Sequence, residues 1–125
     1  MIEIAPGWQL EVERGPDWLF VKPHCDLESS WNSPPLAEAL WELLQQGFAH
    51  RLVLECEEIP ILHTLMIGQL VLLHKRISSR GGVLRICGMS ERNCQVLQGC
   101  RLDDRLPNFD TRADAVHGFR PVKPR

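Results

Sequence analysis

The segment between residues 51 and 87 constrains the fold of this 125-residue chain more than any other part of the sequence. It contains two apolar runs, RLVLEC and VLRIC, and the second run follows the pair Gly81-Gly82. Between the runs, apolar residues recur at the spacing of one helix face over about four turns. This order predicts a strand at 51–56, a helix at 64–79 and a parallel strand at 83–87. The helix residues expected to face the sheet are Met66, Leu70, Leu73 and Ile77.

Two strands and a helix are expected before this unit. Residues 8–13 alternate between apolar and polar, and residues 18–22 return after a Gly-Pro-Asp turn, which predicts an antiparallel hairpin. A helix should follow, with Asn32 or Ser33 as its cap, two prolines in its first turn and Gly47 at its end. The two prolines are Pro34 and Pro35, and the apolar stripe of this helix is Leu36, Leu40, Leu43 and Leu44.

The last third of the chain predicts shorter elements. Ser90 should cap a short helix that ends at Gly99, and residues 106–109 should form a short strand. Thr111 with Asp114 resembles a capping box that opens a final turn or helix.

The expected order is therefore ββαβαβαβα, an α/β domain with a mixed sheet of four to five strands and three to four helices. The domain is expected to cover residues 1–117, followed by a basic, proline-containing tail at 118–125.

Composition excludes several classes of protein. A net charge of −2 and a pI near 6.2 give no basic surface for nucleic acid or an anionic membrane. The longest apolar stretch, residues 65–73, is far shorter than the roughly 20 residues that span a bilayer. The start of the chain lacks the pattern of an export signal, so the cytoplasm is the expected compartment. Five cysteines without CxxC spacing favour reduced, packed thiols over disulfides or zinc.

The order of these parts, together with the stretches LAEALWELL, RLVLEC, IPILHT, SSRGGVLRICGMS and RLDDRLPNFDTRADAV, resembles a STAS domain. This is the family of the anti-sigma factor antagonists, and the resemblance covers roughly residues 8–117. In the family, the loop before the central helix typically reads Asp-Ser-Ser-Gly, and the Ser or Thr after the Asp is phosphorylated by a kinase that is also the anti-sigma factor. Here His63 stands at the Asp position and Thr64 at the phosphoacceptor position, while Leu65 and Met66 replace the second Ser and the Gly.

Thr64 has two interpretations at this point. Its hydroxyl could simply cap the central helix by accepting an N–H of the first turn. The resemblance implies instead that it accepts a phosphate, and a threonine followed by aliphatic residues is similar to the variant loops of stressosome-type STAS proteins. A helix N-terminus tolerates the added negative charge, so the modification would change the surface and leave the domain folded.

The residues around Thr64 form the expected partner-binding surface. Leu65, Gln69 and Leu72 should supply its apolar patch, and Asp26 and Glu58 its polar rim. Trp31, in the loop before the first helix, is a further expected contact, and His63 is expected to be a hydrogen-bonded loop residue. Glu55, Glu57 and Glu58 are expected to be a solvated strand end.

The resemblance implies a non-enzymatic protein whose partner is an anti-sigma factor or a serine/threonine kinase of the ATP-binding anti-sigma type. The alternative is a stressosome-like scaffold or homo-oligomer without a phosphorylation switch, in which Leu65 and Met66 serve permanent packing. No catalytic constellation, cofactor or metal site is expected, because no general base, nucleophile and orienting group can be placed together.

Overall fold

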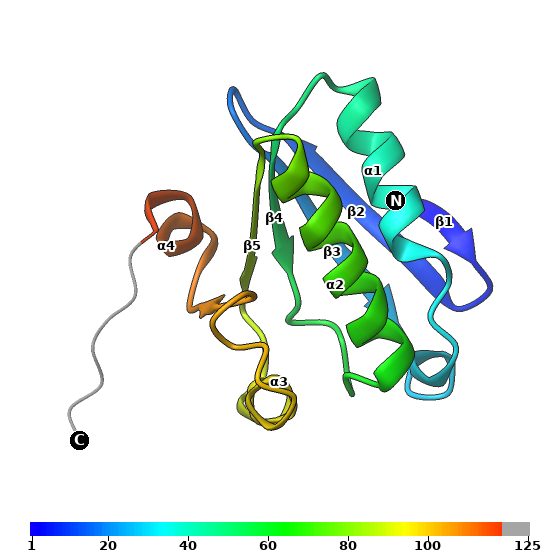
Figure 1. Cartoon of the computed structure of the whole chain (residues 1–125). Helices are drawn as coiled ribbons and strands as arrows, with labels where there is room; N and C mark the ends of the chain where they lie inside the picture. The colour runs from blue at the N-terminus through cyan, green and yellow to red at the C-terminus, as the bar shows by residue number, and fades with distance from the viewer. Residues whose placement is uncertain (119–125) are drawn as a thin grey trace.

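A computed structural model of the chain describes residues 1–118 (Figure 1). The predicted tail at 118–125 lies outside the described residues, apart from Gly118. A single six-stranded sheet runs in the order β1-β2-β3-β4-β5-β6. Its strands are β1 (Ile2–Ala5), β2 (Trp8–Arg14), β3 (Leu19–Cys25), β4 (Arg51–Glu55), β5 (Val83–Cys87) and β6 (Asn108–Phe109). Strands β1 to β3 are antiparallel, and β3 to β6 are parallel.

The expected strand–helix–strand unit is confirmed. Strands β4 and β5 pair in parallel, with Leu52 opposite Leu84 and Val53 opposite Arg85. The helix between them, α2 (Thr64–Ser79), has the bounds predicted from the sequence. Its four predicted core residues are all buried.

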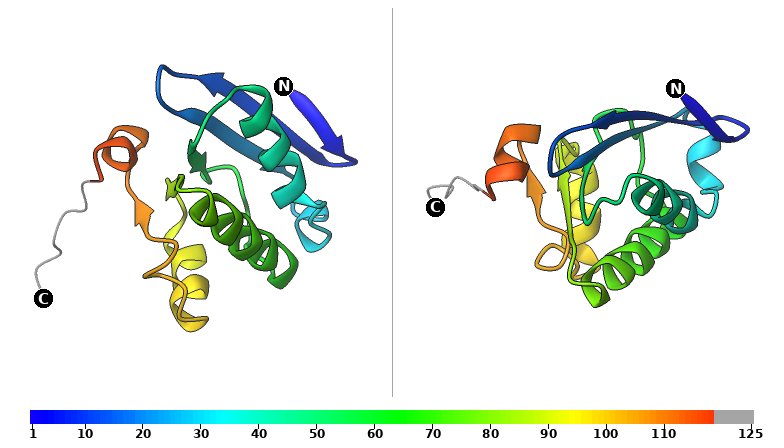
Figure 2. Two further views of the ribbon diagram at one scale, coloured as in Figure 1. Left: turned by 45° about the horizontal axis from the view of Figure 1, so that its top comes forward. Right: turned by 90° about the horizontal axis from the view of Figure 1, so that it is seen from above.

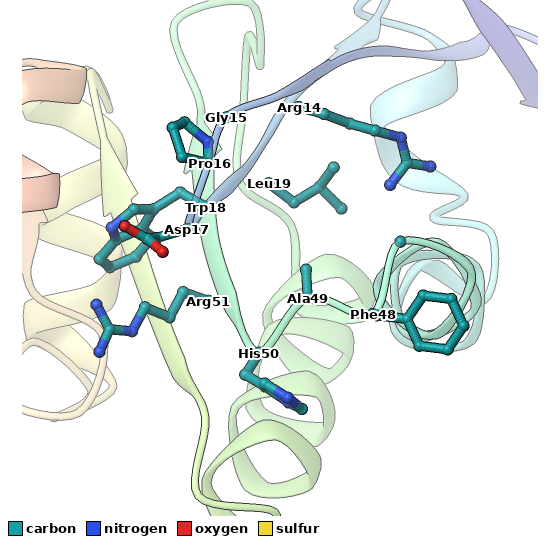
Figure 3. Close-up of a pocket in the computed structure, with 11 residues that line it drawn as sticks. Arg14, Gly15, Pro16, Asp17, Trp18, Leu19, Phe48, Ala49, His50 and Arg51 are labelled. Carbon is teal, nitrogen blue, oxygen red and sulfur yellow. The ribbon is translucent and has the colours of Figure 1, made fainter.

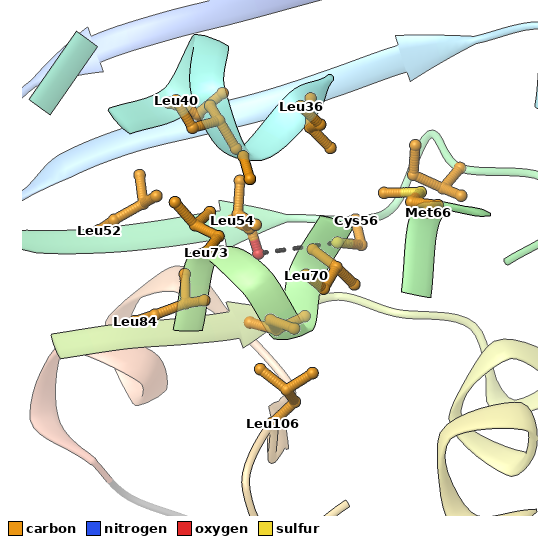
Figure 4. Close-up of a cluster of buried hydrophobic side chains, with 14 of the residues drawn as sticks. Leu36, Leu40, Leu52, Leu54, Cys56, Met66, Leu70, Leu73, Leu84 and Leu106 are labelled. Carbon is orange, nitrogen blue, oxygen red and sulfur yellow. Dashed lines mark hydrogen bonds between the residues drawn. The ribbon is translucent and has the colours of Figure 1, made fainter. Parts of the chain in front are cut away.

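Each face of the sheet is covered by a separate layer of structure. Helices α1 (Leu36–Gln46) and α2 lie side by side on one face, as Figure 2 shows. Leucines of β4 and β5 meet leucines of both helices in the main core (Figure 4). On the other face a smaller cluster gathers under α4 (Arg112–His117); it consists of Trp18, Val53, Cys87, Phe109 and Ala115. Helix α3 (Glu91–Gly99) follows β5 and closes the end of the main core with Leu97.

Strand β1 was not predicted, so the expected sheet of four to five strands was too small. It has only four residues, and Ile2 and Glu3 are exposed, which leaves no run of alternating burial to recognise. Its pairing depends on the tight turn at Gly7, whose φ of 78° is a conformation that favours glycine.

The start of α1 also differs from the prediction. The two prolines precede the helix, Pro35 is its N-cap residue, and neither Asn32 nor Ser33 caps it. A residue before proline is driven out of the helical region, so Pro34 cannot belong to the first turn. The predicted caps Ser90 and Thr111 are confirmed, since their hydroxyls accept the N–H groups of Asn93 and Asp114.

The end of α1 carries an unusual residue. The N–H of Phe48 donates to the Gln45 carbonyl and the N–H of Ala49 to the Leu44 carbonyl, the two bonds that close a Schellman motif. The left-handed position of this motif, normally glycine, holds Phe48 with a φ of 52°, one residue after Gly47. The Phe48 side chain is 89% exposed, so no packing offsets the backbone strain.

Replacing Phe48 with Gly should raise the free energy of unfolding by about 1 kcal/mol, because a left-handed non-glycine residue costs about that much. Urea titration followed by circular dichroism measures it. Phe48→Ala is the matched control, since it removes the same ring and keeps the strain. A Gly variant no more stable than the Ala variant would contradict this account.

No disulfide joins any of the five cysteines, all of which lie within residues 1–118. Cys56 and Cys87 are buried, and burial raises the pKa of both thiols, that of Cys87 to about 12. Burial and the charge of Asp26 raise the pKa of Cys25 to about 11. Cys100 is exposed.

Because the thiolate is the reactive form, the thiols with a raised pKa should stay protonated and slow at a pH of about 8. In a titration of the native protein with a thiol reagent, Cys100 should react first, and Cys56 and Cys87 only after denaturation. A Cys100→Ser variant should lose the fast phase. Rapid reaction of Cys56 or Cys87 in the native state would be inconsistent with their burial.

Candidate partner-binding site

The connections that follow β3 and β4 lie at the same end of the sheet, because the two strands are parallel. The first connection carries Asp26 and Trp31, and the second carries Glu58 and His63 and leads directly into Thr64. Ile59 and Leu62 of the second connection are buried, and they fix it to the core while its polar residues face outward.

Asn93, on α3, holds the backbone of this second connection in place. Its side chain is fully buried; the Oδ1 atom accepts the Leu62 N–H at 3.0 Å, and the Nδ2 atom donates to the Ile59 carbonyl at 3.1 Å. A buried loop must satisfy its backbone polar groups, and one amide side chain here satisfies a donor and an acceptor. The segment that presents Thr64 is therefore anchored two residues before it.

Thr64 is the first residue of α2 and is exposed, as predicted. The interpretation of Thr64 as the helix cap is wrong. The N-cap residue is His63, whose carbonyl accepts the Ile67 N–H, and no side chain caps this helix. The threonine hydroxyl thus stands at a helix N-terminus without being needed to close the first turn.

Trp31 lies against His63, so two connections distant in sequence meet beside Thr64. The ring centroids are 3.8 Å apart with an interplanar angle of 26°, and Trp31 remains 62% exposed. The expectation that His63 is a hydrogen-bonded loop residue is not supported. Its Nε2 atom is buried and has no hydrogen-bond partner among residues 1–118.

A short 3₁₀ helix, η1 (Ser29–Trp31), positions Trp31. The Asp26 carboxylate accepts the Ser29 N–H at 2.7 Å, and the Trp8 indole donates to the Ser29 carbonyl at 2.9 Å. The hydrogen bond from Ser29 lowers the pKa of Asp26, so this carboxylate stays ionised. Gly7 is required nearby, because a Cβ there would lie 1.9 Å from the Ser29 hydroxyl oxygen.

The expected apolar patch divides into two parts. Leu65 and Leu72 are each 56% exposed, but Leu65 is in the first turn of α2, whereas Leu72 lies two turns further along. Gln69 lies between the helices, where its Oε1 atom accepts the N–H of Ala37 at the start of α1. Leu72 and Gln69 line a shallow groove of about 600 Å³ between α1 and α2, beside an ion pair of Arg76 with Glu38.

The acidic residues at and after the end of β4 differ in their exposure to solvent. Glu57 and Glu58 are exposed, as expected, but Glu55 is buried, which corrects that part of the prediction. Both oxygens of Glu55 accept hydrogen bonds from the Arg112 guanidinium, at 3.2 and 2.8 Å, and Glu13 accepts a third. The hydrogen bond to Glu55 raises the pKa of Arg112, so α4 is held to the sheet by a permanent charge.

Glu55, Glu57 and Cys87 form the one group of three metal-ligating side chains found within residues 1–118, with ligand atoms within 4.8 Å of one another. The group is a poor metal site, because Arg112 occupies both Glu55 oxygens and burial disfavours the Cys87 thiolate that a metal would need. Within the same residues, no helix is long and apolar enough to cross a membrane.

Comparison with known proteins identifies the fold. The family model for the STAS domain matches residues 20–115. The chain is a member of the STAS domain family. No curated protein matches it in sequence.

Solved structures agree with this assignment. The Thermotoga maritima protein tm1081 superposes with a TM-score of 0.72 at 19% identity, over 87% of this chain and 92% of its own. An anti-sigma factor antagonist from Mycobacterium paratuberculosis gives a TM-score of 0.72 at 17% identity, over 91% and 96%. The phosphorylated form of SpoIIAA, a Bacillus cell fate determinant, gives 0.61 at 14% identity, over 90% and 99%.

The STAS fold therefore brings Asp26, Trp31, Glu58, His63, Thr64 and Leu65 to one end of the sheet and places Gln69 and Leu72 along α2. Asn93 and Arg112 were not among the residues expected from the sequence to hold the site. A signal for Asn93 did exist, since it stands at i, i+4 with Leu97 on the buried stripe of α3.

Replacing Asn93 with Ala should lower the free energy of unfolding by about 3 kcal/mol, because two buried backbone groups lose their partners. Asn93→Asp should cost at least as much as Asn93→Ala, because it buries a carboxylate whose second oxygen faces the Ile59 carbonyl in place of the lost donor. Gln98→Ala, on an exposed position of the same helix, is the control and should have little effect. Urea titrations measure all three; equal stability of Asn93→Ala and Gln98→Ala would refute the anchoring role.

Proposed function

We propose that this STAS domain is a non-enzymatic, cytoplasmic anti-sigma factor antagonist. It binds an anti-sigma factor or a serine/threonine kinase of the ATP-binding anti-sigma type through the end of the sheet that carries Thr64, and so releases a sigma factor. The observation that supports this most is the placement of Thr64. An exposed hydroxyl that caps nothing stands at the start of the central helix, beside an exposed tryptophan and an exposed leucine.

The exposed aromatic and aliphatic side chains can supply the binding energy. Trp31 stacks on His63, the residue before Thr64, and Leu65 is the residue after Thr64. Interfaces obtain most of their affinity from a few such exposed apolar residues in a desolvated centre. Asp26 directly follows β3 and Glu58 lies in the connection after β4, where carboxylates at a rim fix the orientation of a partner.

Phosphorylation of Thr64 would act as the switch. The phosphate adds about −1.5 to −2 charges at a helix N-terminus, which accommodates an anion. Within the described residues, the Thr64 hydroxyl makes no capping hydrogen bond to α2. Its modification therefore removes no cap that stabilises the fold. The new charge would instead have to enter the interface formed by Trp31 and Leu65, which lowers affinity.

In a second candidate function, the domain has the same fold but no phosphorylation switch. In that case the domain is a scaffold or oligomerisation module. The exposed Leu72 in the groove between α1 and α2 favours it, because that groove lies along the helices, away from Thr64.

Thr64→Glu should weaken binding to the anti-sigma partner at least tenfold, which corresponds to about 1.4 kcal/mol, and change folding stability by about 1 kcal/mol or less. Titration calorimetry against purified candidate anti-sigma kinases, with circular dichroism of each variant, measures both effects. Thr64→Val is the matched control, since it removes the hydroxyl, adds no charge and should bind as the wild type does.

Phosphorylation of the wild type by the same kinases, with none on Thr64→Val, is the direct test of the switch. Equal affinity of wild type and Thr64→Glu, together with no phosphate transfer, would favour the scaffold function.

A further inference from the structure

The end of the sheet opposite Thr64 has a second distinctive surface. The turn between β2 and β3 and the connection between α1 and β4 enclose a hollow of about 500 Å³ (Figure 3). Arg14 and Arg51 stand on opposite sides of it, and Phe48 and His50 lie along the α1–β4 connection. Arg80 follows α2 at the same end of the sheet, just before β5. We call these connections, residues 14–18, 47–51 and 80–82, the basic end.

The arginines of the basic end are not neutralised. All three are exposed, and within residues 1–118 none of them has a carboxylate within 4.0 Å, whereas Lys22, Arg76 and Arg112 all do. The basic end contains only one acidic residue, Asp17. Its positive field is therefore available to another molecule.

Phe48 gives the basic end an apolar anchor. It is the most exposed of the large hydrophobic residues within 1–118, and its backbone is held in a left-handed conformation that glycine would adopt without strain. The backbone strain at Phe48 brings no packing within the molecule, because the ring is exposed to water. It therefore indicates that the ring contacts another molecule.

Two connections at the end that carries Thr64 have the opposite character. The connections after β3 and β4, residues 26–33 and 56–63, hold four carboxylates and no lysine or arginine; the carboxylates are Asp26, Glu28, Glu57 and Glu58. We call these connections the acidic end. Among the cations within residues 1–118, only Lys22 pairs with one of these four carboxylates, Glu57, at 3.6 Å. Leu27, 57% exposed, and Trp31 add apolar surface there.

We propose that the basic end of one molecule docks on the acidic end of a second copy of the same chain, with Phe48 seated against the exposed apolar residues of the partner copy. The two ends are complementary: the unpaired arginines and Phe48 of one copy would face the unpaired carboxylates, Leu27 and Trp31 of the other. Individual exposed ion pairs are weak, so Phe48 supplies most of the affinity and the charges supply orientation.

Such a contact is head-to-tail, so each molecule retains one free end of each kind, and the association continues into a ring or an open chain. It goes beyond the proposed function and competes with it, because a molecule whose acidic end is occupied cannot present Thr64 to an anti-sigma factor.

A pair of complementary variants tests the proposal. Phe48→Asp disables the basic end, and aspartate tolerates the left-handed backbone at that exposed position. Leu27→Lys combined with Glu58→Lys disables the acidic end at two exposed positions. Each variant alone should be a 14.3 kDa monomer, and a 1:1 mixture should form a complex of two molecules and nothing larger, because one intact end of each kind remains.

Analytical ultracentrifugation of the wild type should show association that grows with concentration in about 10 mM salt and disappears in about 1 M salt, where the Debye length falls from about 30 to about 3 Å. Gln98→Asp is the control; it changes the net charge as Phe48→Asp does and should leave the association intact. Arg14→Glu is a second variant of the basic end in case Phe48→Asp fails to fold.

A wild type that stays monomeric at low salt would overturn the proposal, as would a mixture that stays monomeric or a Phe48→Asp variant that still associates. Because Phe48 lies at the far end from Thr64, binding of Phe48→Asp to an anti-sigma partner separates a failure of this proposal from a failure of the proposed function.

Discussion

The burial of β4 on both faces is the constraint on which the rest of the structure depends. Every residue from Leu52 to Cys56 is buried, so a layer of structure has to cover each side of this strand. Helices α1 and α2 provide one layer, and α4 with Trp18 provides the other. Once both faces are covered, the two ends of the parallel strands are the open places where another protein can meet the loops around β4.

The modest net charge of the chain conceals how its charges are distributed. A value of −2 suggests a surface without electrostatic character, yet the arginines of the basic end and the carboxylates of the acidic end are separated by the length of the parallel strands. Apart from Glu57 with Lys22, the ion pairs of Arg112 and Arg76 lie elsewhere: Arg112 contacts Glu55 beneath α4, and Arg76 contacts Glu38 between two helices. Most of the ion-paired charges therefore lie apart from the unpaired arginines at the other end of the sheet.

Much of the fold could be predicted from local pattern, and the site only in part. The helix at 64–79 and the strands around it follow from helical spacing and two apolar runs, because those signals lie within short windows of sequence. The short strand β1 carries no such signal. The stacking of Trp31 on His63 and the amide of Asn93 depend on segments about 30 residues apart, so no local window contains both partners. Glu55 was misjudged for the same reason, since Arg112 is 57 residues away.

Gly7 links the first strands to the candidate site. Any side chain at this position would strike Ser29, and Ser29 belongs to the 3₁₀ turn that sets the orientation of Trp31. Trp8, the next residue, already holds the same turn through its indole N–H. The edge hairpin therefore sets the position of Trp31 through Ser29, so a substitution among the first ten residues can move this exposed ring without changing the ring itself.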